Sequence, residues 1–245
     1  MSAGSLLLRL AGPMQAWGTQ SRFCVRDTGL EPSKSGVLGL LCAALGKPRD
    51  EHEPAPPGTP DLADLVRLAM AVRVDRPGTM AADYHTAQNV ACSKPGQKPK
   101  PCEPSTRYYL ADAEFLVGLH GQIDLLRRLD NALANPVWPL YLGRKSFVPS
   151  IPVREPDGLL PGTRLLDALK TRPWYVRAPR EEPADPPRLR IVLESEDLVG
   201  DVRQDVPRTF VSRQRSFTVR RVRDVELWPV PKELIKEWPP CTCPS

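Results

Sequence analysis

Hydrophobic positions near the start of the chain alternate with the period of a strand and then recur with the period of a helix. Leucine occupies every second position over 6–11, and the Gly-Pro pair at 12–13 ends this predicted strand. Apolar residues then recur at helical spacing over 33–46, where Ser33 is placed to cap a helix and Gly46 to end it. The opening of the chain therefore predicts a strand, a loop and an amphipathic helix.

The same two periods continue along the chain and predict its fold. They indicate further strands at 66–74, 107–121 and 137–153, and a second long helix at 123–133. The order β-α-β-β-α-β is typical of the ferredoxin-like fold, which RRM-type RNA binders share. We therefore predict an α+β protein with a ferredoxin-like domain at 1–154 and a smaller β-rich appendage with proline-rich connections at 155–245.

One segment within the first predicted domain does not fit a packed core. Residues 76–106 are basic in their second half and contain few apolar side chains. We expect this segment to be a protruding, mobile tip between two strands; a simple linker is the alternative.

Positive charge is concentrated late in the chain. The formal net charge is +5, and residues 203–223 alone contain seven arginines and one acid, Asp205. Guanidinium groups match the geometry of phosphate oxygens, so this stretch favours a polyanion as partner; a solvated strand face is the alternative. Three arginines represent this predicted basic strand: Arg208, Arg213 and Arg215.

Several functional classes are disfavoured by composition. Arg9 interrupts the first apolar run, so we expect no signal peptide, and no stretch approaches the length of a membrane span. The six cysteines include no CxxC pair and no spacing typical of zinc ligands. We expect a cytoplasmic protein with free thiols, no cofactor and no metal.

The start of the first helix is a candidate anion site. Its backbone N–H groups lack helical partners, and Lys34 with Ser33 and Ser35 adds a charge and two hydroxyl groups. We expect phosphate there, with an ordinary capped helix as the alternative. An ATPase P-loop is disfavoured, because Thr28 and Ser33 stand where its glycines belong.

Two polar loops add further candidates. After the first strand, Trp17 could stack on an unpaired base and Gln15 could bond a base edge, although a buried tryptophan that anchors the loop is the alternative. At 143–146, a glycine would let the backbone approach a phosphate, and Arg144 and Lys145 would neutralise it. Ser146 completes this loop, for which a surface turn is the alternative.

Four stretches of the chain together resemble a known family. The first is the run Leu-Arg-Leu-Ala-Gly-Pro-Met-Gln-Ala-Trp-Gly from residue 8, followed by Pro-Ser-Lys-Ser-Gly from residue 32. Asp-Tyr-His-Thr at 83–86, Tyr-Leu-Gly-Arg-Lys-Ser at 141–146 and Pro-Arg-x-Phe-x-Ser-Arg at 207–213 follow in the same order. They resemble the CasD family, the RAMP-type subunits that cap the 5′ end of the guide RNA in type I-E CRISPR surveillance complexes, called Cascade.

The resemblance implies a non-catalytic RNA-binding subunit. It implies that the 5′ handle of the CRISPR RNA is held by residues of three segments: Gln15, Trp17, Ser33, Lys34, Ser35, Arg144, Lys145 and Ser146. It implies a hairpin thumb at about 76–106 that reaches the guide–target DNA duplex, with candidate contacts at Lys94, Lys98, Lys100 and Arg107. Cascade backbone subunits and the large subunit are the implied protein partners, and no membrane is implied.

Two other functions stay open from the residues. His85 beside Tyr84 could support metal-independent cleavage of repeat RNA, with a base activating the 2′-hydroxyl and a cation stabilising the phosphorane. Related subunits in another CRISPR subtype are nucleases, but in the resembled type a separate subunit cleaves. A small-molecule phosphate enzyme is the second alternative.

Overall fold

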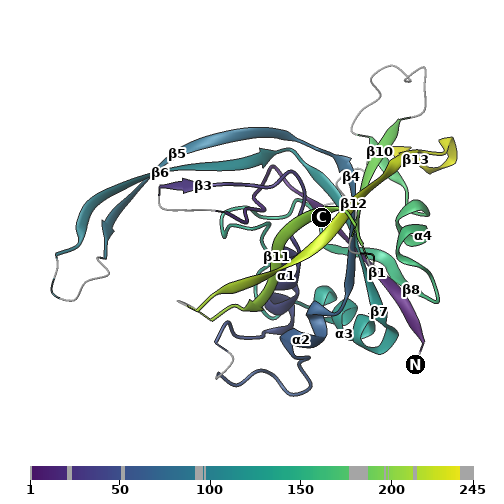
Figure 1. Cartoon of the computed structure of the whole chain (residues 1–245), viewed down its shortest axis with the longest axis horizontal. Coiled ribbons are helices and arrows are strands. Elements are labelled where there is room, and N and C mark those ends of the chain that lie inside the picture. Colours follow the sequence, from purple (N-terminus) through teal and green to yellow (C-terminus); the bar gives the residue numbers. More distant parts are fainter. Residues whose placement is uncertain are drawn as a thin grey trace, which may run out of the picture.

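A seven-stranded sheet forms the main body of the protein (Figure 1). The computed structural model describes residues 2–20, 24–50, 53–91, 96, 98–176, 187–195, 197, 199–211 and 214–237. The strand order in the sheet is β11-β12-β10-β4-β7-β1-β8. Within the described chain, no helix is both long and apolar enough to cross a bilayer.

The first two thirds of the chain supply four strands and two long helices of this body. The strands are β1 (Ala3–Ala11), β4 (Ala69–Arg76), β7 (Glu114–Gln122) and β8 (Arg154–Pro161), and each neighbouring pair is antiparallel. The helices are α1 (Lys34–Leu45) and α3 (Ile123–Ala134), and a short helix α2 (Leu62–Val66) precedes β4. The prediction of a mixed α+β protein is therefore confirmed.

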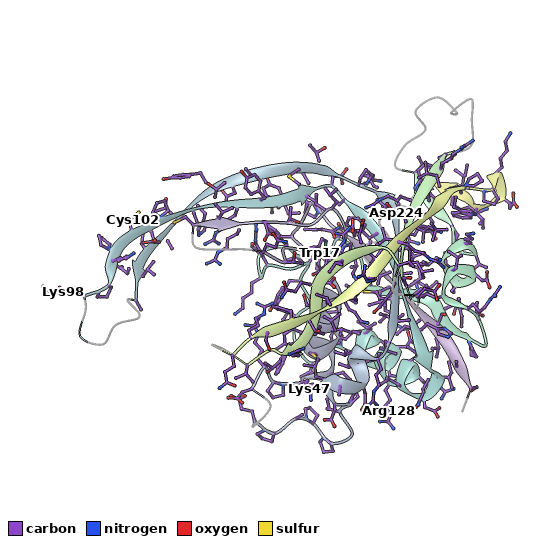
Figure 2. All side chains as sticks on the ribbon, in the orientation of Figure 1. Trp17, Lys47, Lys98, Cys102, Arg128 and Asp224 are labelled. Carbon is purple, nitrogen blue, oxygen red and sulfur yellow. The ribbon has the colours of Figure 1, made fainter. Side chains whose placement is uncertain are left out.

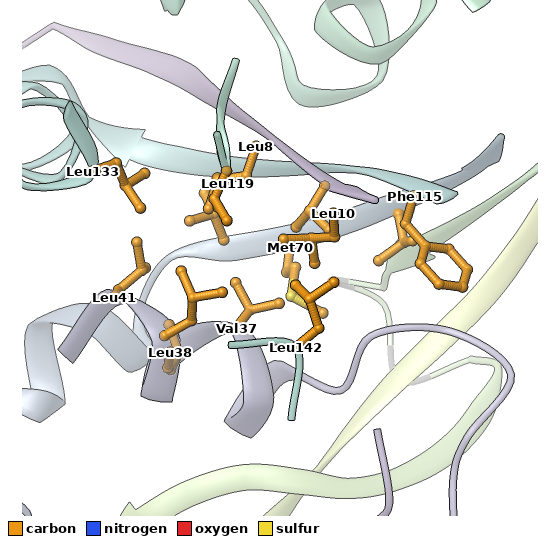
Figure 3. Close-up of a cluster of buried hydrophobic side chains, with 14 of the residues drawn as sticks. Leu8, Leu10, Val37, Leu38, Leu41, Met70, Phe115, Leu119, Leu133 and Leu142 are labelled. Atoms are coloured by element: carbon orange, nitrogen blue, oxygen red, sulfur yellow. The ribbon is translucent and has the colours of Figure 1, made fainter. Parts of the chain in front are cut away.

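The helices α1 and α3 cover one face of the sheet, and the main core lies between them and the strands. Every second residue of β1 points into this core, as the leucine alternation predicted. Figure 3 shows side chains from the sheet and α1 meeting there. Its labelled members include Leu8, Leu10, Val37, Leu38, Leu41, Met70, Phe115, Leu119 and Leu133.

The opposite face of the sheet is also buried. A second layer covers it, made of α4 (Leu165–Lys170), β9 (Trp174–Val176), the short 3₁₀ turn η1 (Lys232–Leu234) and β13 (Ile235–Glu237). Leu7, Ala71 and Leu116 pack with α4 in a smaller apolar cluster. This second layer explains why Leu7 departs from the simple alternation of β1.

Charged side chains are buried under this second layer. Arg9 donates to three carboxylates, those of Asp75 (3.0 Å), Glu114 (2.9 Å) and Glu155 (2.8 Å). Arg73 forms a second ion pair with Asp75 at 2.6 Å. All five residues are at most 5 % exposed, and we call them the buried charge network. Arg73 also donates to backbone carbonyls at 169, 172 and 173, which ties α4 and the segment after it to the sheet.

The C-terminal strands extend the main sheet. They are β10 (Arg188–Glu194), β11 (Asp201–Thr209) and β12 (Ser216–Pro229), and β10 pairs with β4 through Arg190↔Val74. The sequence predicted a smaller β-rich appendage here, and these strands join the main sheet through the pairing of β10 with β4. The division at residue 154 stays a prediction.

The last of these four strands, β8, begins later than predicted. Residues 137–153 were expected to form a strand and are irregular, while β8 at Arg154–Pro161 lies in a segment predicted to be a turn-rich connection. Prolines at 136, 139, 149 and 152 explain the first error, since a proline cannot donate to a strand ladder.

A long hairpin leaves the body between β4 and β7 (Figure 1). Its strands are β5 (Thr79–Val90) and β6 (Lys100–Ala111), paired along nearly their full length. The predicted continuous strand over 107–121 is interrupted at Asp112, whose φ of 56° turns the chain from β6 into β7. Two short strands, β2 (Met14–Gln15) and β3 (Val25–Arg26), pair with the base of β6.

Candidate functional site

The first helix begins and ends where the sequence predicted. The Ser33 side chain accepts a hydrogen bond from the Gly36 N–H, and Gly46 ends the helix in the left-handed region with φ 68°. The Lys34 N–H donates to Asp205 Oδ2 at 2.7 Å. A carboxylate from β11 therefore occupies the position predicted for a phosphate.

Arginine keeps that carboxylate charged. Arg220 donates to both oxygens of Asp205, at 2.7 and 2.8 Å. Burial alone would raise the pKa of the Asp205 carboxyl, but the hydrogen bond and charge of Arg220, together with the Lys34 N–H, hold that pKa below its usual value. The helix start is thus neutralised within the protein.

The Lys34 side chain is not a free cation. It is 3 % exposed, and its Nζ donates to both carboxylate oxygens of Glu194 at 2.9 Å. Burial lowers the pKa of Lys34 against the opposing effect of Glu194. The expectation of an accessible lysine at this helix start is wrong, because β11 packs against α1; Ser33 and Ser35 are buried as well.

Trp17 and Gln15 are also buried. The Trp17 ring is 2 % exposed and packs beside Gly36, where a Cβ would lie 2.8 Å from the ring. Its Nε1 donates to Gln15 Oε1 at 3.1 Å, and Gln15 Nε2 donates to the carbonyls of Leu10 (3.0 Å) and Ala113 (2.8 Å). The predicted exposed stacking ring is wrong, and the alternative of a loop-anchoring tryptophan is confirmed.

The loop at 143–146 lies at the base of the hairpin. Arg144 Nη2 donates to the carbonyl of Tyr108 on β6 at 2.7 Å and to that of Arg26 on β3 at 3.5 Å. Lys145 and Ser146 are exposed beside it. Of the predicted RNA-binding residues, those of this loop remain accessible.

Three arginines converge at this point, and we call Arg26, Arg107 and Arg144 the arginine cluster. Arg26 and Arg107 are direct partners in the parallel pairing of β3 with β6. Burial and then repulsion from Arg107 lower the pKa of Arg144, with a further contribution from Arg26. None of the three forms an ion pair with another described residue. Two carboxylates oppose this repulsion: Asp83, which lies opposite Arg107 in the β5–β6 pairing, and Asp27 both raise the pKa of Arg144. Three positive charges are therefore only partly offset at this point.

A polar groove continues from the cluster along the body. One part, with a volume of about 270 Å³, is lined by Arg26, Ser35, Arg215 and Phe217. A second part of about 420 Å³ shares Thr19 and Gln204 with it and runs past the start of α1 between the 17–33 loop and strands β11 and β12. We call both parts together the polar groove.

Of the three acids that line the polar groove, Glu31 and Asp205 are paired, whereas Asp201 forms no ion pair with a described residue. Glu31 accepts from Arg190 at 2.6 Å and pairs with Arg203 at 2.9 Å, and Asp205 is held by Arg220. Arg215 forms no ion pair with any described residue and lies over the Phe217 ring at 5.1 Å. The groove thus joins a neutralised end near α1 to a cationic end at the hairpin base.

Other predicted contacts are scattered. Lys98 and Cys102 lie at the far end of the hairpin, and Trp17 lies in the body (Figure 2). Lys100 pairs with Glu103 at 2.9 Å, and Arg208 is exposed on β11. Lys94 and Arg213 lie outside the described residues.

The candidate catalytic pair is on the hairpin. His85 Nδ1 lies 3.6 Å from Asp83 Oδ2, and Tyr84 is 74 % exposed on the neighbouring position of β5. In the described chain, no group of three or more histidine, cysteine or acidic side chains is placed to hold a metal ion.

Arg26 is the site residue that sequence reasoning missed. It lies in a polar loop, and its neighbours in the chain show no strand period. Its position depends on a two-residue parallel pairing with β6, about eighty residues away in the chain. Only the three-dimensional structure brings it to Arg107.

Comparisons with known proteins agree with this architecture. A family model described as CRISPR-associated protein (Cas_Cas5) matches residues 5–223. The Escherichia coli (strain K12) protein "CRISPR system Cascade subunit CasD" is 37% identical over 147 residues, which cover 58% of this chain and 65% of that relative. The aligned region thus spans a little under two thirds of the relative's length.

Two solved structures are similar over nearly the whole chain. One, described as a Cas protein, is 42% identical with a TM-score of 0.70, and the match covers 96% of this chain and 100% of that one. The other belongs to a CRISPR RNA-guided surveillance complex and is 33% identical with a TM-score of 0.76, covering 95% and 93%.

Proposed function

The chain belongs to the Cas_Cas5 family of CRISPR-associated proteins, and from this premise we propose that it is a non-catalytic subunit of a type I-E Cascade complex that holds the 5′ handle of the guide RNA. The similarity to a Cascade subunit named CasD and to a chain of an RNA-guided surveillance complex supports this assignment. The chemistry of the arginine cluster supports a location for the RNA in this proposal.

The arginine cluster is the observation that carries the proposal. Three guanidinium groups lie close enough to repel one another, and Asp83 and Asp27 offset their charge only in part, so an incoming anion is attracted by the remaining positive charge. Single-stranded RNA carries one phosphate per nucleotide, and arginine binds phosphate through parallel N–H donors. We propose that the handle crosses this cluster and enters the polar groove beside Arg215, with Lys145 and Ser146 at its edge.

The arrangement of elements supports an RNA-binding fold of the RAMP type. In chain order, β1, α1, β4, β7, α3 and β8 follow β-α-β-β-α-β, and the four strands lie in the order β4-β7-β1-β8. This is the spatial order of a ferredoxin-like sheet. Unlike a typical RRM, this sheet has both faces covered, so we propose that RNA binds at its edge and not on its face.

We propose that the β5–β6 hairpin is the thumb. Each strand has twelve residues, and a strand of that length spans about 40 Å. Lys98 and Lys100 at its far end would contact the guide–target duplex, while base pairing carries target specificity. Cascade backbone subunits and the large subunit are the proposed neighbours.

The proposal is tested with labelled guide RNA on the purified full chain. We expect binding that weakens steeply as salt rises from about 50 to 200 mM, full recovery of uncut RNA, and no competition from ATP. Tight ATP binding with little RNA binding would instead indicate a small-molecule phosphate enzyme. Metal-independent cleavage that His85→Ala abolishes would establish the endoribonuclease alternative.

A further inference from the structure

The hairpin joins the body through few attachments, all at its base. β5 pairs with β6 alone, and the described partners of β6 other than β5 are β2 at Met14↔Ala111 and β3 at Val25↔Thr106. The outer six residues of β6, from Lys100 to Ser105, pair within the described chain only with β5. The direction of the whole hairpin is therefore set by contacts near residues 106–111.

Arg144 is one of these contacts. Its Nη2 donates to the carbonyl of Tyr108 at 2.7 Å and to that of Arg26 at 3.5 Å, so one guanidinium joins β6 to β3 where their short ladder ends. Its planar face lies over the Phe147 ring at 5.2 Å. Phe147 is in turn buried and packs against Tyr109 of β6, with ring centroids 5.8 Å apart.

The turn that carries Arg144 is fixed to the body. The Leu142 N–H donates to Phe147 O at 2.8 Å, and the Phe147 N–H donates to Arg144 O at 2.9 Å. Gly143 has φ 92°, and a Cβ there would overlap the carbonyl oxygen of Ala16. The turn thus lies against the first loop, whose Ala16 N–H donates to Leu142 O at 3.1 Å.

We propose that Arg144 is a positioning residue that fixes the angle of the hairpin, and that its guanidinium geometry matters as well as its charge. The consequence for guide RNA rests on the function proposed above, but the angle itself is a property of the free chain. Lysine keeps the charge of arginine but lacks the planar group that can stack on Phe147 while bonding two carbonyls.

A small tilt at the base of the hairpin displaces its tip by a large distance. The outer six residues of β6 span about 20 Å, so a tilt of about 10° at the base moves the tip by about 3.5 Å. That displacement equals the spacing of one nucleotide along a strand, about 3.4 Å in B-DNA. A tilt of this size after loss of Arg144 would therefore move the tip by about one nucleotide step.

The experiment measures the angle without RNA. One spin label is placed on Cys102, which is exposed near the hairpin tip, and the other on a cysteine introduced by Asp124→Cys, whose side chain is 72 % exposed on α3. Buried Cys42 can stay, because burial raises its pKa to about 11 and keeps its thiol protonated. Serine replaces the remaining cysteines, Cys24, Cys92, Cys241 and Cys243.

We expect both Arg144→Lys and Arg144→Ala to broaden or shift the distance distribution by several ångströms, while the unfolding midpoint of the body changes little. Lys145→Ala is the matched control, since Lys145 is the exposed neighbour in the same turn, and it should leave the distribution unchanged. In the assembled complex, Arg144→Lys should weaken the hydroxyl-radical footprint under the hairpin tip more than the footprint of the handle.

Two results would overturn the proposal. An unchanged distance distribution in Arg144→Ala would show that the hairpin angle does not depend on this residue. A lysine variant identical to wild type in both distance and footprint would leave Arg144 as a charge that binds phosphate. The distances are recorded without RNA and do not depend on the RNA-binding proposal. Failure of that proposal would be seen separately, as the absence of both footprints, tip and handle, in the wild-type protein.

Discussion

The arginines under the sheet and those at the hairpin base face opposite electrostatic surroundings. Arg9 and Arg73 are almost completely buried, and carboxylates lie within 3.0 Å of each. Arg26, Arg107 and Arg144 are more accessible, and none has an ion pair with a described residue. The first group links structural layers, while the second is the group that we propose binds RNA.

The two groups differ in burial and in carboxylate pairing, and not in the kind of charge that they carry. A buried cation without a carboxylate is very costly, so each of the first group must have partners within the fold. A cation at the surface keeps its hydration and can exchange it for phosphate. Composition alone counts both groups in the same net charge of +5.

Removing Arg9 should have the largest effect. Arg9→Met leaves three buried carboxylates without their shared donor, and breaking a buried pair from one side costs about 3–5 kcal/mol. Urea unfolding measures the loss. Arg164→Ala is the control, because Arg164 is 86 % exposed in its pair with Asp167 and should change stability by less than about 0.5 kcal/mol. An equal loss of unfolding free energy in the two variants would contradict the distinction between buried and exposed arginines.

Neutralising arginines of the arginine cluster should weaken RNA binding and leave the free energy of unfolding nearly unchanged. The double variant Arg26→Gln/Arg107→Gln removes two charges from the proposed RNA path, so the slope of log affinity against log salt should decrease by about 1.4, with roughly a tenfold loss of affinity. Fluorescence anisotropy with guide RNA measures both. An unchanged slope would show that these two residues do not contact the RNA.

A smaller effect on stability is expected from Glu114, a member of the buried charge network, and it should depend on pH. Burial raises the pKa of this carboxyl against the influence of Arg9, while Asp75 raises it further and Arg76 lowers it. A carboxyl with a raised folded-state pKa stabilises the fold below its unfolded pKa, and this contribution is lost as pH rises through the folded value.

The amide variant Glu114→Gln tests that direction, because the amide stays neutral at every pH. The stability of wild type relative to this variant should fall as pH rises above about 4.3, the ordinary pKa of glutamate. Urea unfolding over a pH series gives the difference. A gap that grows in favour of wild type with rising pH would mean that its ion pair with Arg9 outweighs burial.

Local signals in the sequence predicted local structure well. Ser33 and Gly46 identified both ends of α1, because capping depends on residues a few positions apart. The leucine alternation of β1 likewise identified the core face. These features need no knowledge of the rest of the chain.

The candidate site was harder to predict because distant segments decide exposure. Trp17 is buried because Gly36 leaves space for its ring, and Lys34 is paired because β10 places Glu194 beside it. Neither relation has a periodic signal in the sequence. Arg144 was identified from its loop, but its bond to Tyr108 depends on the long-range packing of β6.

The carboxylate of Asp205 at the first turn of α1 has a consequence for the order of assembly. Since the chain supplies its own anion there, no nucleic acid is required to complete that end of the helix. This end of α1 can therefore fold completely before any anionic ligand binds to the protein.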